Sequence, residues 1–344
     1  EIEGAPTALL NTPPDQTHGR VVTEHDILPG AWYLDGGRIP TCIAVEAGQA
    51  DLFLSGYLGI DLITKGRAVY RLLDAVVTFH APLPTAGYVI HYDIRINHFM
   101  KQGGMYLFRF EFDATVDGQP LLTMRDGCAG FFTEEELAAG QGIVQTRMDT
   151  HRVDGVTTSD WSILAPHDDP DQSESYSDAQ LNALRTDDAE KLRQCFGDAF
   201  ADLPLSQPVG LPGGAMRLVH RIVELELSGG RFGLGRIVGE ADIHPDDWFL
   251  TCHFCDDQVM PGTLMYECCL HTLRVLLLRW GWVGECDEFV YEPIPGVSSQ
   301  LKCRGQVTAA TRRVRYELVV KEAGYQGTGD GVQETGGGTK YVLA

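Results

Sequence analysis

Apolar and polar residues alternate along four stretches of the first 135 residues, a pattern typical of strands with one buried face. These strands are predicted at Ala68–His80, Tyr88–Phe99, Tyr106–Val116 and Leu121–Phe132. Ahead of them, the apolar segment Cys42–Leu58 has the spacing of a single helix. The first block is therefore expected to be one helix followed by a long antiparallel sheet.

A second block of similar length repeats this layout. Its pattern predicts strands, a loop, an apolar helix and two further strands, in the order Met216–Leu227, Phe232–Ala241, His253–Gly262, Thr263–Leu278, Val297–Gln306 and Arg313–Lys321. The helix carries leucine or valine on every side, so it is expected to be buried all round. A sheet wrapped around a buried helix indicates an α+β fold.

The two blocks also align at single positions. Pro40 precedes Glu46 by six residues, and Pro261 precedes Glu267 by the same six. Two copies of one fold in one chain suggest an internal pseudo-dimer, and two unrelated α+β domains are the alternative.

The blocks are separated by an acidic segment. Residues 134–202 hold sixteen Asp and Glu against five Lys and Arg, with little hydrophobic periodicity before a helix expected at Ala179–Phe200. Such a composition is typical of a connector. The predicted division is 1–140, 141–205 and 206–344.

Charge and cysteines narrow the classes of function. The net charge of −21 over 344 residues disfavours a nucleic-acid or anionic-membrane surface, because both would be repelled. No apolar run reaches the ~18 residues of a membrane helix, and we expect no signal peptide. Nine cysteines without a framework spacing fit a reduced, cytoplasmic protein. The chain lacks a first methionine and stops inside an apparent strand, so we expect it to be a piece of a longer protein.

The chemistry is concentrated in residues 248–267, WFLTCHFCDDQVMPGTLMYE. His253 stands just before a Met-Pro-Gly turn that opens the apolar helix. A neutral histidine, with an ordinary pKa of ~6.5, can accept a proton. The unpaired N–H groups of Gly262 and Thr263 at a helix start can bind a developing oxyanion. Together with a carboxylate, these groups suffice to eliminate water from a thioester. The alternatives are an exposed or core His253 and a plain turn glycine at 262.

Residues 216–273 and 301–322 resemble the bacterial β-hydroxyacyl-acyl-carrier-protein dehydratases of the hot-dog fold, including their isomerising form. The run HF-x-x-D-x-V-M-P-G is the specific part of this likeness. Residues 39–61 resemble the degenerate hot-dog in the dehydratase region of polyketide-synthase-like polyunsaturated fatty acid synthases. The resemblance implies a double hot-dog, a pseudo-dimer of two antiparallel sheets each wrapped around a central helix. Gln258 and His271 depart from the family's usual proline and glutamine.

The resemblance also implies how the site is composed. In the family, a histidine of one hot-dog works with a carboxylate on the central helix of the other, so His253 should face Glu46. The position that matches His253 in the first block is Trp32. The reciprocal site at Glu267 is therefore expected to be inactive, and Glu267 itself is either structural or functional. For Glu46, the alternative is an acid at a helix N-terminus favoured by the dipole.

The implied activity is dehydration of 3-hydroxyacyl thioesters on an acyl carrier protein to trans-2-enoyl thioesters, in fatty acid or polyunsaturated fatty acid biosynthesis. His253 would take the α-proton, Glu46 would supply a proton to the hydroxyl, and the N–H of Gly262 would bind the carbonyl oxygen. No metal or diffusible cofactor is expected, because phosphopantetheine carries the substrate. Isomerisation to the cis-3 product is left open.

The expected partners are acyl carrier protein domains and other domains of a megasynthase. A basic cluster, Lys302, Arg304, Arg312, Arg313 and Arg315, is either the surface that receives the carrier protein and its phosphate or a solvated face.

Other functions remain as rivals. One is a carrier-binding scaffold without activity, and another is a hot-dog thioesterase, in which a carboxylate activates water. Cys252-x-x-Cys255 with His253 suggests zinc, but no second ligand pair stands at metal-site spacing. A Cys252 nucleophile is disfavoured because neighbours on an extended strand point to opposite faces.

Overall fold

A computed structural model describes residues 1–140, 142–158, 163, 172–186, 188–197, 210–281, 290–327 and 338–343. The helices are α1 (Thr41–Glu46), α2 (Asp51–Tyr57), α3 (Ile60–Thr64), α4 (Glu134–Ala138), α5 (Arg147–Thr150), α6 (Asp178–Ala183), α7 (Ala189–Phe196), α8 (Trp248–Cys252) and α9 (Gly262–Arg279), with short 3-10 turns at Ala8–Leu10, Pro14–Gln16 and Gly214–Met216. The strands are β1 (Ile2–Glu3), β2 (Gly19–Asp26), β3 (Val69–Phe79), β4 (Val89–Gln102), β5 (Met105–Val116), β6 (Gln119–Phe132), β7 (Val156–Thr157), β8 (Glu174–Tyr176), β9 (Arg221–Glu226), β10 (Arg236–Asp242), β11 (Ser298–Lys302), β12 (Arg313–Val319), β13 (Glu322–Gly327) and β14 (Gly338–Leu343). Among them, no helix is long and apolar enough to cross a membrane.

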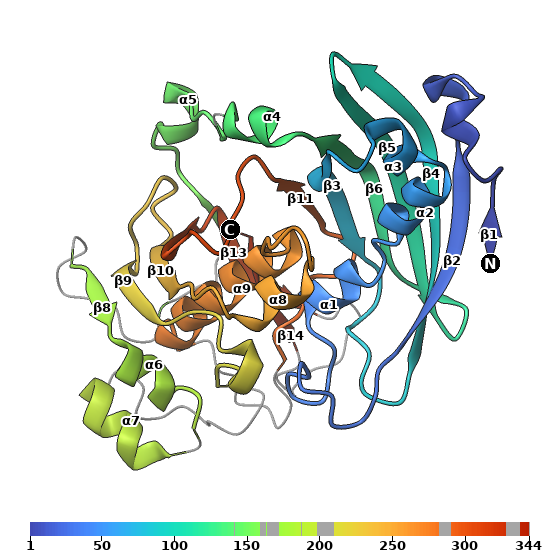
Figure 1. Ribbon diagram of the computed structural model, residues 1–344. Helices are drawn as coiled ribbons and strands as arrows, with labels where there is room; N and C mark the ends of the chain where they lie inside the picture. The colour runs from blue at the N-terminus through green and yellow to red at the C-terminus, as the bar shows by residue number, and fades with distance from the viewer. Residues whose placement is uncertain are drawn as a thin grey trace. The chain divides into compact units, whose positions relative to one another are not determined.

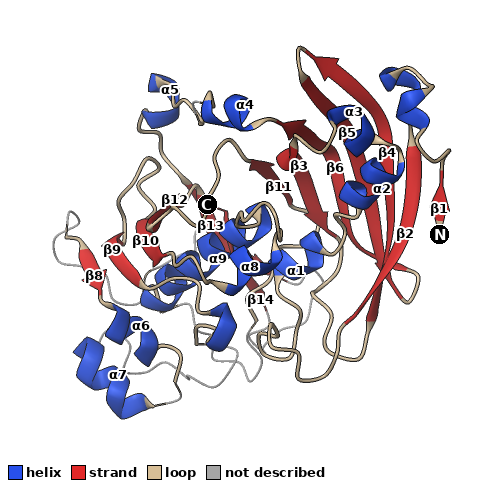
Figure 2. Ribbon diagram, viewed as in Figure 1, coloured by secondary structure: helices blue, strands red, loops and turns tan. Residues whose placement is uncertain are grey.

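The chain forms two compact units that interleave in sequence. The first comprises Glu1–Val144, Phe249–Leu264 and Glu292–Val307, and the second comprises Gln145–Trp248, Met265–Tyr291 and Thr308–Ala344. The first unit contains an antiparallel sheet in the order β1-β2-β4-β5-β6-β3-β11. Helices α1, α2 and α3 lie against one face of this sheet (Figures 1 and 2). The four strands predicted in the first block, β3 to β6, are confirmed.

The prediction of one continuous helix at Cys42–Leu58 is wrong. The structure has two helices, α1 and α2, separated at Ala47–Ala50. A Cβ at Gly48 would lie 2.6 Å from Cζ of Phe112, so this point of the chain approaches the sheet more closely than a side chain permits. The break makes Glu46 the last residue of α1.

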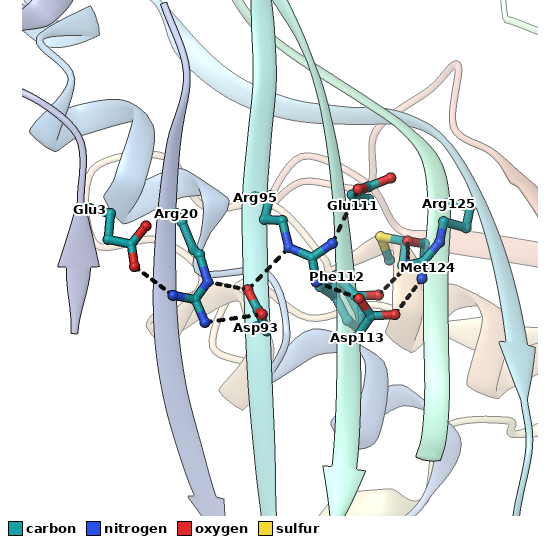
Figure 3. Close-up of polar contacts among 9 residues, drawn as sticks. All are labelled: Glu3, Arg20, Asp93, Arg95, Glu111, Phe112, Asp113, Met124 and Arg125. Atoms are coloured by element: carbon teal, nitrogen blue, oxygen red, sulfur yellow. Dashed lines mark hydrogen bonds and ion pairs between the residues drawn. The ribbon is translucent and has the colours of Figure 1, made fainter.

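Alternation along the strands separates a core face from a charged face. On β4, the side chains of Ile90, Tyr92, Ile94 and Ile96 are buried on the helix side, and Phe108, Phe110 and Phe112 continue this core on β5. The positions between them carry charges that form a ladder of ion pairs across the sheet, which runs through Glu3, Arg20, Asp93, Arg95, Glu111, Asp113 and Arg125 (Figure 3). Opposite charges on neighbouring strands reinforce the pairing.

The last strand of this sheet comes from the C-terminal block. β11, predicted as the longer strand Val297–Gln306, pairs antiparallel with β3 in a register that runs from Ser298 opposite Thr78 to Lys302 opposite Asp74. Hydrophobic alternation indicated a strand here but not its partner, because edge pairing is set by tertiary structure.

The second unit has its strands in two sheets, ordered β12-β10-β9-β8 and β14-β13-β7. The strands predicted at Met216–Leu227 and Phe232–Ala241 are shorter in the structure, as β9 and β10. Helix α9 matches its prediction to within one residue at each end, and none of its residues is exposed. It packs closely on β10, since a Cβ at Gly239 would lie 2.6 Å from Oγ1 of Thr272. The α+β fold expected from the sequence is confirmed.

The acidic segment is more than a connector, which corrects the prediction. β8 pairs antiparallel with β9, and β7 pairs with β13. The single helix expected at Ala179–Phe200 is two helices, α6 and α7, and its last residues lie outside the described ones. Leu181 on α6 and Leu192 on α7 are buried, so these helices pack as part of the second unit. The division into 1–140, 141–205 and 206–344 stays a prediction, and its boundary at 205 lies outside the described residues.

Candidate active site

His253 lies at the start of a short, closed loop between α8 and α9. Its backbone N–H donates to the carbonyl of Phe249 at 3.2 Å, and its own carbonyl accepts the N–H of Val259 at 3.0 Å. The segment before it, including Cys252, is helical and not the extended strand that we expected. The loop thus fixes the backbone of His253 from both sides.

His253 and Glu46 meet within the first unit, as the sequence predicted. Nε2 of His253 lies 3.4 Å from Oε1 of Glu46, and their side chains are 21% and 32% exposed. The pair is therefore sheltered but open to a small substrate. The alternative for Glu46, an acid at a helix N-terminus, is wrong because Glu46 ends α1.

The second ring nitrogen sets the tautomer of His253. Nδ1 lies 2.8 Å from the carbonyl of Val259, which can only accept, so Nδ1 carries the proton and Nε2 holds the lone pair in the neutral ring. Burial alone would lower the pKa of His253. The hydrogen bond and negative charge of Glu46, with the Val259 carbonyl, outweigh burial and raise that pKa above its ordinary value.

Glu46 is itself held by two donors. Oγ1 of Thr263 donates to its Oε2 at 2.5 Å, and Nε2 of Gln49 donates to the same oxygen at 3.1 Å. Oε1 is left facing His253. Thr263 was predicted as a secondary site residue for its backbone, whereas its hydroxyl is what reaches Glu46. Gln49 was missed, and its spacing of three residues from Glu46 was the signal available.

Gly262 begins α9 next to Thr263, so its backbone lies beside Glu46. Its amide has no hydrogen-bond partner within the described part of the chain, as expected at the first residue of a helix. A Cβ at Gly262 would lie 3.0 Å from Sγ of Cys303, so glycine avoids a close contact with this side chain. The arrangement offers a free donor near the His253–Glu46 pair.

Glu267 has a different environment, in the second unit. Its Oε1 lies 3.3 Å from Nε2 of His271 one helical turn on, and both side chains are less than a tenth exposed. Trp32, which stands where a reciprocal histidine would be needed, is 53% exposed and packs edge-on against Tyr33. An indole has no basic nitrogen, so Trp32 cannot serve as a proton acceptor.

A buried acid near the pair was not predicted. Asp51 is fully buried and accepts a hydrogen bond from the hydroxyl of Tyr70 at 2.9 Å, while its Oδ1 has no partner within the described part of the chain. Burial raises the pKa of Asp51 to about 8, and the charge of Glu46 adds to the rise. No periodicity marks such a residue, because Asp51 lies inside the single helix predicted at Cys42–Leu58, where a polar residue is not distinctive.

The basic cluster is largely neutralised. Nη2 of Arg304 donates to both carboxyl oxygens of Asp74 at 2.8 Å, while Arg313 and Arg315 pair with carboxylates on β9 and β10. Lys302 and Arg312 are exposed, and no ion pair of either is found in the described ranges. Carrier-protein binding at this cluster stays a prediction.

The thiol of Cys252, next to His253, is a poor candidate for a nucleophile. Burial raises the pKa of the Cys252 thiol, and neighbouring Cys255 and Glu46 add to the rise, so the thiolate is disfavoured. The described residues include no group of three or more His, Cys, Asp or Glu side chains suited to a metal ion.

Comparison with known proteins agrees with the sequence motif. Residues 211–335 match the FabA-like domain. The chain is 35% identical over 321 residues to a polyunsaturated fatty acid synthase subunit of Thraustochytrium sp., an alignment that covers 90% of this chain and 20% of that protein. The chain thus spans about a fifth of the length of this relative.

Solved structures were compared as well. An inactive mutant of the CurK dehydratase is 11% identical, with a TM-score of 0.37, over 97% of this chain and 89% of that one. The dehydratase heterocomplex ApeI:P from Xenorhabdus doucetiae is 22% identical, with a TM-score of 0.25, over 35% and 79%. These scores are too low to support an argument. The sequence matches thus show that residues 211–335 are similar to FabA-like domains and that the chain is similar to one part of a polyunsaturated fatty acid synthase subunit.

Proposed function

We propose that this chain dehydrates 3-hydroxyacyl thioesters on an acyl carrier protein to trans-2-enoyl thioesters, in the synthesis of polyunsaturated fatty acids. The observation that carries the proposal is the pairing of His253 Nε2 with Glu46 Oε1 at 3.4 Å. The FabA-like match of residues 211–335 supports the same reaction class.

His253 acts as the base. Because Nδ1–H is engaged by Val259, the lone pair on Nε2 is free to accept the α-proton of the substrate. The electron pair of the broken C–H bond then forms the C=C bond as the C–O bond to the β-hydroxyl breaks.

Glu46 acts as the acid. Thr263 and Gln49 both donate to Oε2, which disfavours a proton on that oxygen and leaves Oε1 as the protonated position. Oε1–H transfers its proton to the departing hydroxyl, and water leaves. After turnover Nε2 of His253 holds the proton taken from the substrate and Glu46 is a carboxylate. Transfer of that proton from Nε2 to Oε1, 3.4 Å away, restores the neutral base and the protonated acid.

Gly262 binds the thioester oxygen. Negative charge develops on this oxygen as the α-proton leaves, and a free amide at a helix N-terminus stabilises such charge. His253 and Glu46 carry out both proton transfers of the proposed reaction, so no diffusible cofactor is required. The substrate is delivered on the phosphopantetheine arm of the carrier protein. Within the predicted basic cluster, Lys302 and Arg312 are the exposed cations for which the described residues include no ion pair, and each is proposed to contact the carrier protein.

Mass spectrometry of a 3-hydroxyacyl carrier protein incubated with the chain tests the proposal. Loss of one water from the acyl group is the expected result. Release of the free acid would instead indicate a thioesterase, and an unchanged acyl group would indicate a scaffold that binds carrier protein without turnover.

A further inference from the structure

Arg71 on β3 forms a two-point clamp on the loop that carries His253. Its Nη1 donates to Oδ2 of Asp257 at 2.5 Å, and its Nη2 donates to Oδ1 at 2.8 Å. Asp257 lies between His253 and Pro261 in the sequence. The two side chains are only 13% and 21% exposed, so this fork-to-fork ion pair is sheltered from solvent.

The same guanidinium also holds the chain after β11. Nε and Nη2 of Arg71 donate to Oε1 of Gln306 at 3.2 and 2.9 Å. The next residue, Val307, accepts the backbone N–H of Met260 at 2.9 Å. Arg71 therefore fixes the loop directly at Asp257 and indirectly at Met260.

Hydrogen bonds inside the loop connect these anchor points to the imidazole. Phe254 and Asp257 bind each other's backbone, at 2.8 and 3.3 Å. Val259 binds His253 twice, through its N–H to the His253 carbonyl at 3.0 Å and through its carbonyl to Nδ1 at 2.8 Å. A shift of Asp257 or Met260 would thus move the carbonyl that sets the tautomer of His253.

We propose that Arg71 is a positioning residue for His253: by clamping Asp257 and Gln306 it holds the loop so that Nδ1 meets Val259 and Nε2 faces Glu46. The proposal rests on the proposed dehydration for its kinetic consequence, but its structural consequence is independent of it. A displacement of about 1 Å in a catalytic group can lower a rate by a factor of about 100, so a clamp on this loop bears directly on turnover.

The structure provides a matched control on the same strand. Asp74 on β3 also pairs with an arginine of the segment Glu292–Val307, since both of its carboxyl oxygens accept from Nη2 of Arg304 at 2.8 Å, and among the described residues this pair has no contact with the His253 loop. Asp257→Asn and Asp74→Asn therefore make the same chemical change in two Asp–Arg pairs that each include a residue of β3, the Asp74 pair being the more exposed. Arg71→Lys keeps the charge but loses the planar fork, and it serves if Asp257→Asn does not fold.

The experiment uses the full chain and two readouts. The first readout is nitrogen NMR, which reports the tautomer of His253; the signal is assigned by its absence in His253→Asn. The second is steady-state kinetics on a 3-hydroxyacyl carrier protein, which gives kcat and KM separately. Asp257→Asn and Arg71→Lys are expected to reduce the share of the Nδ1-protonated tautomer and to lower kcat about tenfold or more, with KM within about twofold of its original value. Asp74→Asn should leave both readouts unchanged.

The two proposals fail in distinguishable ways. If the unaltered chain removes no water, the proposed function is lost, and the tautomer measurement alone decides the role of Arg71. The inference is overturned if Asp257→Asn and Arg71→Lys leave the tautomer of His253 unchanged, or change it no more than Asp74→Asn does. The ion pair of Arg71 with Asp257 would then only stabilise the fold.

Discussion

The hydroxyl of Thr263 donates to Oε2 of Glu46 at 2.5 Å, across 217 positions of sequence. This bond ties the first turn of α9 to the last residue of α1. It turns Oε1, the other carboxyl oxygen, toward His253. The orientation of the acid in the proposed reaction therefore depends on a side chain from the FabA-like part of the chain.

Thr263→Val should test that dependence. The change removes the donor while keeping the shape, and a hydrogen bond to a charged group contributes about 1.5–3 kcal/mol, so kcat should fall about 10-fold to 100-fold. Thr263→Ser keeps the hydroxyl and should retain most of the rate. Dehydration assays of both variants compare them, and equal rates for Val and Ser would contradict the role of this bond.

The pKa of His253 should depend on Glu46. The raised pKa of His253 means that the His253–Glu46 pair keeps one shared proton up to a pH above the ordinary ~6.5. The proposed acid step needs that proton, so the rate should fall as the pH rises through this midpoint. Glu46→Gln removes the charge that opposes burial, so the pKa of His253 should drop. An NMR titration of the His253 ring in both proteins measures the change. A pKa that stays the same or rises in Glu46→Gln would show that the two groups are not coupled.

Asp51→Asn is expected to stabilise the protein at neutral pH. The folded pKa of Asp51, about 8, lies above its unfolded value, so the folded state binds the proton more tightly. The resulting stability is present at low pH and is lost as the pH rises toward 8. An amide avoids this loss and still accepts from Tyr70, for a gain on the order of 2 kcal/mol at pH 7 that shrinks toward pH 4. Urea unfolding at the two pH values measures it, and a pH-independent effect would contradict the assignment.

Asp113→Asn should have the opposite pH dependence. Burial alone would raise the pKa of Asp113, but Arg125 and Arg95 overcome this and lower it. Its contribution to stability is therefore present above the unfolded pKa and is lost as the pH falls through the lowered one. Because the side chain is about one-third exposed, the expected cost of the substitution at pH 7 is only about 0.5–1 kcal/mol. Unfolding at pH 7 and near pH 2 should show that cost at the first value only; the same cost at both would rule out an electrostatic origin.

The sequence predicted the parts of this structure that depend on local pattern. Strict alternation placed β3 to β6, and continuous apolarity placed α9 to within one residue at each end. The pairing of His253 with Glu46 came from the spacing of each residue to its proline, read through the family resemblance. Pattern sufficed for the strands and the helix because they depend on neighbouring residues, whereas the pairing of His253 with Glu46 was predicted only through the family resemblance.

The remaining features depend on contacts between distant residues. The helix break at Gly48 results from its approach to Phe112. The edge strand β11 is set by its partner β3. Gln49, Asp51 and Arg71 are polar residues with no distinguishing pattern, and they became recognisable only once their partners were known.

The central claim is that one imidazole and one carboxyl perform the dehydration. The most direct test compares water loss from a 3-hydroxyacyl carrier protein for His253→Ala, Glu46→Gln and Glu267→Gln, followed by mass spectrometry. General acid–base groups typically contribute factors of about 100 to 10,000, so the first two variants should be nearly inactive, while Glu267→Gln should retain most of the rate. Equal losses in all three folded variants, or a fully active Glu46→Gln, would contradict the single site formed by His253 and Glu46.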